Sequence, residues 1–232
     1  MSLPTRCPLC RSHDTGKYCE DDRRSYVKCR RCDLIFVPKR FHPSAESAKA
    51  RYDLHRNSPN DPGYRSFLMG IVNPIVENVP KGRKGLDYGS GPTPVLTEML
   101  RQRGYGMESY DIHYAANPSV LTRKYDFLTC CETAEHFSEP RKEWERFLAL
   151  IGADGIIAVK TEPMRETRDF SSWHYIRDET HVCFYSKGTF RWLADFGGFT
   201  LEYSGNTALF RRGRDRRGEN RRDGRGSQAG VG

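Results

Sequence analysis

The sequence predicts an α/β fold, in which a doubly wound, mostly parallel sheet follows a small cysteine-rich domain. Three observations predict this fold. Residues 84–96 form a short apolar strand that ends in a carboxylate, then a glycine turn and the first turn of a helix. About twenty residues later, residues 104–111 form a second strand that also ends in a carboxylate. Two Cys-x2-Cys pairs lie near the N-terminus.

Length and composition restrict the class of protein. A chain of 232 residues suffices for one complete α/β domain and a small additional unit. It has no run of about eighteen or more apolar residues, so we expect no membrane span. The first residues lack the basic-then-apolar pattern of a signal peptide. We therefore expect a cytoplasmic protein, whose eight cysteines serve as metal ligands and core thiols rather than as disulfides.

The formal net charge of +8 is concentrated at the C-terminus. From Arg211 on, eight arginines stand against three acidic residues, which leaves +3 for residues 1–210. A charge of +3 on a body of this size does not require a polyanionic partner. Residues 212–232 have no apolar periodicity, so we predict a disordered basic tail. A solubilising terminus is favoured over a segment that binds RNA loosely.

Residues 1–40 are predicted to form a zinc ribbon. Eighteen residues separate the two Cys-x2-Cys pairs, and this spacing is typical of a structural Zn²⁺ site with the ligands Cys7, Cys10, Cys29 and Cys32. Four thiolates close the coordination sphere, so the ion would stabilise the fold and not catalyse; the alternative is a set of unligated thiols. The ribbon carries both basic and acidic residues. It could bind RNA, but a ribbon that shapes the substrate entrance is favoured.

Residues 41–81 are predicted to form a helical linker or cap. A helix begins after Ser44, a good N-cap residue, and the Pro- and Asn-rich residues 57–63 interrupt the chain. A second helix covers residues 64–79, where apolar residues recur at helical spacing. Four polar side chains of this region are candidates to face an active site: Tyr52, His55, Asn57 and Tyr64.

The glycine turn predicts a nucleotide-type site. Gly89 and Gly91 allow positive φ and bring backbone N–H groups close to a ligand at a helix N-terminus. The carboxylate of Asp111, at the end of the next strand, is at the spacing expected of an acid that binds a pair of ribose hydroxyls.

The remaining elements follow in order. We expect helices at 93–103, 141–150 and 187–197, buried strands at 127–131 and 155–160, and a hairpin at 199–203 and 207–211. Only fourteen residues separate Asp111 from Asp126, so a strand between them is predicted to be short or absent. Residues 173–186 are rich in His, Trp and Tyr and follow a strand, as a substrate lid would.

Several of these motifs, in this order, resemble the class I S-adenosylmethionine (SAM)-dependent methyltransferases. Residues 87–91 (Asp-Tyr-Gly-Ser-Gly) resemble their first motif, and residues 125–137 resemble their fourth strand and the loop after it. Residues 150–159 resemble the entry to the fifth strand. A NAD-binding Rossmann domain is the nearest rival, but it does not account for residues 131–136.

The resemblance implies a Rossmann-like domain over residues 82–211, with an antiparallel last strand. It implies SAM as cofactor, with Asp87 ordering the glycine turn and Asp111 holding the ribose. The cofactor-binding residues would be Asp87, Gly89, Gly91, Asp111 and Glu132. His136 and His181 follow sheet edges where the acceptor would lie, so they are the candidates to take its proton.

We therefore expect a methyltransferase that acts on a small-molecule acceptor. The alternatives are an RNA base methyltransferase that uses the ribbon to bind substrate, and a non-catalytic scaffold with the same fold. The sequence identifies neither the acceptor nor the oligomeric state.

Overall fold

The computed structural model describes residues 5–54, 57–165, 167 and 169–213. Most of the predicted tail, residues 214–232, lies outside these residues, as does His55. Among the described residues, no helix is both long and apolar enough to cross a membrane.

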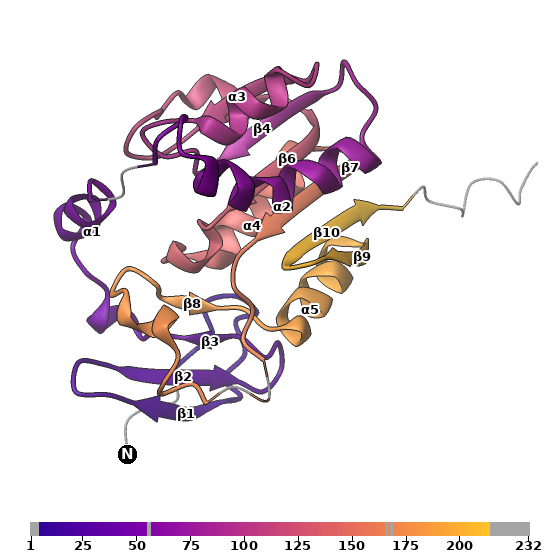
Figure 1. Cartoon of the computed structure of the whole chain (residues 1–232). Coiled ribbons are helices and arrows are strands. Elements are labelled where there is room, and N and C mark those ends of the chain that lie inside the picture. Colours follow the sequence, from indigo (N-terminus) through magenta and orange to yellow (C-terminus); the bar gives the residue numbers. More distant parts are fainter. Residues whose placement is uncertain (1–4, 55–56, 166, 168, 214–232) are drawn as a thin grey trace, which may run out of the picture.

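A six-stranded sheet forms the centre of the fold, with strand order β5-β4-β6-β7-β10-β9 (Figure 1). The first four strands in this order pair in parallel, and β10 pairs antiparallel with both β7 and β9. The sheet is the predicted mostly parallel one with an antiparallel end. Its strands are β4 (Lys84–Tyr88), β5 (Gly106–Tyr110), β6 (Tyr125–Cys131), β7 (Ile151–Lys160), β9 (Phe199–Ser204) and β10 (Thr207–Arg212).

Helices cover both faces of this sheet, because successive side chains of a strand point to opposite faces. Phe127 packs in one apolar cluster with α2 (Pro62–Asn78) and α3 (Val95–Arg101). Its neighbour Leu128 packs in the other cluster, with α4 (Pro140–Leu150) and α5 (Lys187–Gly197). The strands are buried on both sides, which explains their continuous apolar sequences.

The sheet lacks a strand beyond β5. Residues 112–124, all described, contain the short 3₁₀ helix η2 (Pro118–Thr122) and no strand that extends the sheet. The expectation drawn from the fourteen-residue spacing is confirmed. The helix predicted at 93–103 is shorter: its N-cap residue is Pro94 and its last residue is Arg101.

The cysteine-rich domain forms a second sheet, of order β1-β2-β3-β8. Its first three strands are β1 (Thr15–Glu20), β2 (Ser25–Cys29) and β3 (Ile35–Phe36). The fourth, β8 (Cys183–Phe184), comes from the segment between β7 and α5 and pairs antiparallel with β3 (Figure 1). The division of the chain at residues 40, 81 and 211 stays a prediction, and β8 joins the first and third of those units.

A short connecting region lies between the two sheets. It contains η1 (Lys39–Phe41) and α1 (Ala45–Tyr52), and the Ser44 hydroxyl accepts a hydrogen bond from the Ser47 N–H as the predicted N-cap. Two further 3₁₀ helices lie near the ends of strands: η3 (Ala134–His136) after β6, and η4 (His174–Arg177) in the predicted lid.

Candidate functional site

The glycine turn lies at the carboxyl ends of three parallel strands. Gly89 and Gly91 have φ of +80° and +67°, a backbone region that favours glycine. The Gly89 N–H donates to the Tyr110 carbonyl at 2.7 Å, which joins the turn to the end of β5. A Cβ on Gly89 would lie 2.2 Å from Cγ2 of Thr133, so only glycine fits between β4 and the loop after β6.

Asp87 lies beneath the turn. Its side chain is 2% exposed, and its two oxygens accept hydrogen bonds from the Thr97 and Thr129 hydroxyls, each at 3.0 Å. Burial raises the pKa of this carboxyl to about 6. Asp87 therefore links β4 to α3 and β6 from below, in keeping with the predicted ordering role.

Asp111 follows β5 and organises the loop beside the turn. One carboxylate oxygen accepts from the Gly91 N–H at 2.9 Å, and the other accepts from the N–H groups of His113 and Tyr114 at 2.8 and 3.2 Å. A carboxylate has about four acceptor positions and three are used here, so the side chain keeps capacity for one ligand hydroxyl.

Glu132 follows β6 in a left-handed conformation, with φ of +46°. Its N–H donates to the Lys160 carbonyl at 2.8 Å, and Oε2 lies 3.3 Å from the Tyr175 hydroxyl. Burial, reinforced by the negative charge of Glu135, raises the pKa of Glu132 to about 8, although Lys160 opposes this shift. Positive φ is uncommon outside glycine, and such strain recurs at functional sites.

His136 and His181 lie against each other, with ring centroids 4.8 Å apart. Nδ1 of His136 lies 3.1 Å from the Thr180 carbonyl, and Nδ1 of His181 lies 2.7 Å from the Tyr175 carbonyl. Burial lowers both pKa values, that of His181 to about 4 with the help of the neighbouring His136. The structure thus brings the two predicted histidines together as neutral rings.

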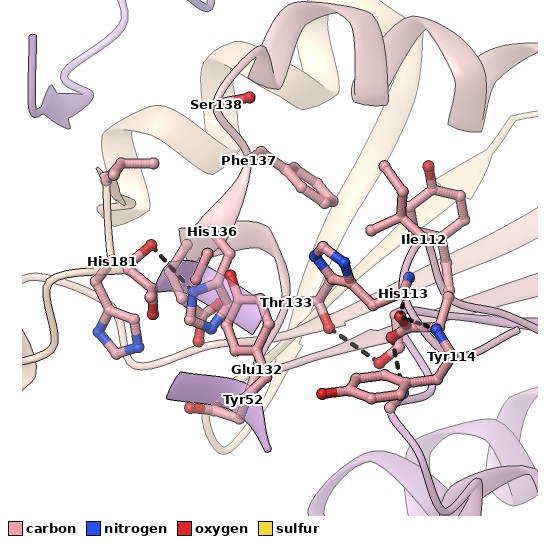
Figure 2. Close-up of a pocket in the computed structure, with 18 of the residues that line it drawn as sticks. Tyr52, Ile112, His113, Tyr114, Glu132, Thr133, His136, Phe137, Ser138 and His181 are labelled. Carbon is pink, nitrogen blue, oxygen red and sulfur yellow. Dashed lines mark hydrogen bonds between the residues drawn. The ribbon is translucent and has the colours of Figure 1, made fainter. Parts of the chain in front are cut away.

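A cavity of about 840 Å³ joins these groups. Gly89, Gly91, Asp111, Glu132 and both histidines line it, whereas Asp87 does not. In Figure 2, His136 and His181 lie on one side of Thr133, and Ile112, His113 and Tyr114 lie on the other.

Tyr52 also lines the cavity and contacts both of these groups of residues. Its ring lies 5.6 Å from that of His113 and 5.1 Å from that of His136. Asn57 and Tyr64 also line the cavity, as the sequence suggested; His55 is outside the described residues.

Glu135 and Tyr175 are buried at the site, and neither was among the predicted site residues. Glu135 is completely buried, and Tyr175 donates a hydrogen bond to its Oε1. Burial raises the pKa of Glu135 to about 7. An acid three residues after Glu132 was visible in the sequence, but its burial depends on Tyr175, forty residues away.

The four predicted zinc ligands lie together in the cysteine-rich domain. Cys7, Cys10, Cys29 and Cys32 are buried, and their sulfurs all lie within 4.8 Å of one another. Arg11 and Asp33, which follow the two pairs, both have φ of +61° and donate their N–H groups to the carbonyls of Cys7 and Cys29. The two Cys-x2-Cys pairs therefore form equivalent turns, and their four sulfurs face a common centre.

Comparisons with known proteins agree with the fold described above. A family model described as "Methyltransferase domain" matches residues 62–204, more than half of the chain. No curated protein sequence matches the chain.

The chain is similar to several solved structures, and the first one described here shows the same fold. A SAM-dependent methyltransferase from Archaeoglobus fulgidus has a TM-score of 0.50 at 15% identity, over 67% of this chain and 76% of that one. A Burkholderia thailandensis 1,6-didemethyltoxoflavin-N1-methyltransferase, with its substrate and S-adenosylhomocysteine bound, has a TM-score of 0.48 at 12% identity, over 84% and 96%. An O-methyltransferase family protein from the same organism has a TM-score of 0.47 at 12% identity, over 70% and 61%, so the chain spans less than two thirds of its length.

Proposed function

Because the chain belongs to the methyltransferase-domain family, we propose that it transfers a methyl group from SAM to a small-molecule acceptor. The cavity supports this proposal most directly. It is lined by the glycine turn, by Asp111, by the half-buried His136 and by the buried His181, and its volume of about 840 Å³ is within the usual range of ligand pockets.

The residues at the glycine turn fit the cofactor. Gly91 has open space where a Cβ would point, and the buried Oγ of Ser90 has no hydrogen-bond partner among the described residues. An orphaned buried hydroxyl at a cavity wall favours a polar ligand there. Gly89 and Gly91 would contact the methionine part of SAM, and Asp111 would bind its ribose. Glu132 would contact the cofactor from the loop after β6. When bound, SAM supplies an electrophilic methyl group on a sulfonium.

The residues of the chain would act mainly by alignment and by exclusion of water, which can contribute about 7–11 kcal/mol. Tyr52 lines the cavity, and Asp87 keeps the glycine turn in place. Nδ1 of both His136 and His181 faces a carbonyl, so Nε2 of each ring is left to accept a hydrogen bond from an acceptor hydroxyl or amine. With a pKa of about 4, His181 is better suited to orient a proton than to remove it.

A structural zinc ion in the ribbon is part of the proposal. The Sγ atoms of Cys7 and Cys32 lie 3.6 Å apart, and those of Cys10 and Cys29 lie 3.4 Å apart. Sulfurs around tetrahedral zinc lie about 3.8 Å apart when each Zn–S bond is about 2.3 Å. The donor set is closed, so it would stabilise the fold.

The ribbon's contacts support a small-molecule acceptor over RNA. Arg30 pairs with Asp14 at 2.9 Å, and Lys28 pairs with Asp33 at 2.7 Å, so basic side chains of the ribbon are largely balanced by acids. The ribbon also docks on the segment that carries His181, through the pairing of β3 with β8. This arrangement favours a ribbon that supports the acceptor side of the cavity.

Calorimetry with S-adenosylhomocysteine tests the cofactor assignment. Asp111→Ala should weaken binding by roughly 100-fold or more, because each hydrogen bond to a charged group contributes about 1.5–3 kcal/mol. Asp126→Ala is the matched control. The Asp126 carboxylate accepts a hydrogen bond from the Lys84 N–H at the start of β4, at the end of the strands away from the glycine turn. Absence of binding to the wild type at millimolar ligand would instead favour the non-catalytic scaffold.

Transfer of a labelled methyl group tests the acceptor. We expect label from SAM to enter a metabolite extract, and Asp111→Ala to abolish the transfer. Label that enters total RNA in preference to the extract would overturn the small-molecule assignment.

A further inference from the structure

Glu135, His136 and His181 bring three metal-ligating atoms together at the wall of the cavity. One carboxylate oxygen and one nitrogen of each imidazole all lie within 4.8 Å of one another. Glu135 and His136 lie in η3, directly after β6, and His181 lies in the segment that leads into β8. This cluster is separate from the four cysteines of the ribbon.

The hydrogen bonds of the two imidazoles prepare them as ligands. Nδ1 of each ring faces a backbone carbonyl, that of Thr180 for His136 and that of Tyr175 for His181. A carbonyl oxygen can only accept a hydrogen bond, so the ring nitrogen that faces it must donate; the proton of each neutral ring is therefore on Nδ1 and the lone pair is on Nε2. Metal-binding histidines usually show this pattern, in which the second ring nitrogen donates to a carbonyl or carboxylate.

The carboxylate of Glu135 lacks a hydrogen-bond partner on one side, among the described residues. The residue is completely buried, and its Oε2 has no hydrogen-bond partner among the described residues. The Tyr175 hydroxyl donates to Oε1 and so fixes the orientation of the group. A buried acidic oxygen without a donor is costly unless it is protonated or bound to a cation.

We propose that Glu135, His136 and His181 bind one divalent first-row transition-metal ion, with open coordination positions that face the cavity. Two imidazoles and one carboxylate suit Mn²⁺, Fe²⁺, Co²⁺ or Zn²⁺ better than Mg²⁺ or Ca²⁺, which prefer oxygen ligands. Three protein ligands leave positions for water or substrate, as in catalytic metal sites, whereas four thiolates leave none.

The ion would bind an oxygen of the acceptor, a role that rests on the proposed methyl transfer. A metal-bound hydroxyl loses its proton more readily than a free one. The acceptor O–H would release its proton to solvent, and the oxygen would form the new O–C bond as the C–S bond of SAM breaks. The products are a methyl ether, neutral S-adenosylhomocysteine and one proton. His136 and His181 would then be ligands, and the acceptor would be a hydroxyl compound.

Titration with Mn²⁺ tests the site in the full chain with its ribbon already filled with zinc. Electron paramagnetic resonance of free Mn²⁺ should show one ion bound per chain. Since the loss of an outer-shell partner alone typically costs 10–100-fold in affinity, His136→Gln and His181→Gln should each weaken binding by at least about 100-fold. Enhanced relaxation of water protons should show that bound Mn²⁺ keeps exchangeable water.

His174→Gln is the matched control. This histidine belongs to the same segment, but its side chain is 69% exposed and it pairs with Glu162 outside the cluster. Its substitution should leave Mn²⁺ affinity unchanged. Wild-type protein that binds no Mn²⁺, equal binding by both cluster variants and the control, or a bound ion without exchangeable water would each overturn the proposal. S-adenosylhomocysteine binding, measured on the same samples, separately reports whether the proposed function holds.

Discussion

The two ends of the cavity are built in different ways. At the glycine turn, each contributing segment directly follows a parallel strand: residues 89–91 follow β4, Asp111 follows β5, and Glu132 follows β6. At the histidine end, His136 also follows β6, but His181 and its neighbours belong to a segment with little regular structure of its own.

That segment is held in place by the ribbon. β8 pairs with β3, and the Val37 N–H donates to the Val182 carbonyl at 2.9 Å. The guanidinium of Arg24, which is 4% exposed, donates to the carbonyls of Ile176, Asp178 and Glu179 at 2.8–2.9 Å. The difference implies that the glycine-turn end, the proposed cofactor end, depends on the central sheet, whereas the histidine end, the proposed acceptor end, depends on the cysteine-rich domain and on the zinc ion proposed for it.

Loss of the proposed ribbon zinc should give the largest difference between the two ends of the cavity: the histidine end should be disrupted, and the glycine-turn end should be nearly unaffected. Zinc binding contributes roughly 10 kcal/mol or more to small zinc domains, comparable with the whole stability of a typical domain, about 5–15 kcal/mol. We therefore expect Cys29→Ser to remove zinc, unfold the ribbon and abolish methyl transfer. S-adenosylhomocysteine affinity should fall by less than about 10-fold, since the hydrogen bonds that hold the glycine turn and Asp111 come from residues that end or follow β4 and β5.

Cys19→Ser is the control for this substitution, because Cys19 lies in β1 outside the cysteine cluster. It should keep the zinc, as measured by mass spectrometry of the native protein. If Cys29→Ser loses cofactor binding together with the ribbon, the two ends are not independent and the comparison fails.

Gly89→Ala should damage the cofactor end specifically. Gly82 and Gly89 both have φ of +80°, but a Cβ on Gly82 would meet nothing within 4 Å. Gly82→Ala should therefore cost only backbone strain, about 1–2 kcal/mol. Gly89→Ala adds displacement of Thr133, about 1–3 kcal/mol more. Urea unfolding and calorimetry check both values, and only Gly89→Ala should weaken S-adenosylhomocysteine binding; equal effects of the two substitutions would refute the close-packing argument.

Arg24→Ala should damage the acceptor end. It leaves three carbonyls of residues 176–179 without their donor, so we expect a loss of about 2–3 kcal/mol in the free energy of unfolding. Arg23 is the matched control, because its side chain is 47% exposed and it makes longer bonds, of 3.1 and 3.4 Å, to the same segment. Arg23→Ala should cost less than about 1 kcal/mol. Mn²⁺ affinity should fall for Arg24→Ala alone, and unchanged affinity would show that the segment keeps His181 in place without the arginine.

The same difference explains what the sequence could predict. The glycine turn, the strand over 127–131 and the spacing to Asp111 are local patterns, because the carboxyl ends of parallel strands meet at one edge. The two Cys-x2-Cys pairs are likewise local, and so is the loss of a strand after β5. All of these patterns span about twenty residues or fewer.

The acceptor end depends on contacts between distant residues. β8 has only two residues and no strand signal, and it forms because Ile35 and Phe36 offer an edge to pair with. The burial of Glu135 depends on Tyr175, and that of Arg24 on carbonyls more than 150 residues away. A charged residue in a sequence gives no sign of such burial, so pattern alone could not identify Arg24 as a buried contact.

A further expected effect, which appears only as a change with pH, is a slope in stability at the cofactor end. The pKa of Asp87 is raised by burial to about 6 in the folded protein, against about 3.9 in an unfolded chain. Between these values the folded state holds the proton more tightly, so the stability that the neutral carboxyl provides is lost as pH rises from about 4 to 6. A shift of about two units corresponds to at most about 3 kcal/mol.

Asp87→Asn removes this titration and keeps the shape of the side chain. The free energy of unfolding of Asp87→Asn minus that of the wild type should therefore increase from pH 4 to pH 6 and level off above it. Denaturant unfolding across this range measures the difference, in which the titrations of all other groups largely cancel. A difference that does not vary with pH would mean that Asp87 is already ionised at pH 4, stabilised by the Thr97 and Thr129 hydroxyls. The turn would then rest on a buried charge instead of a neutral hydrogen-bonded acid.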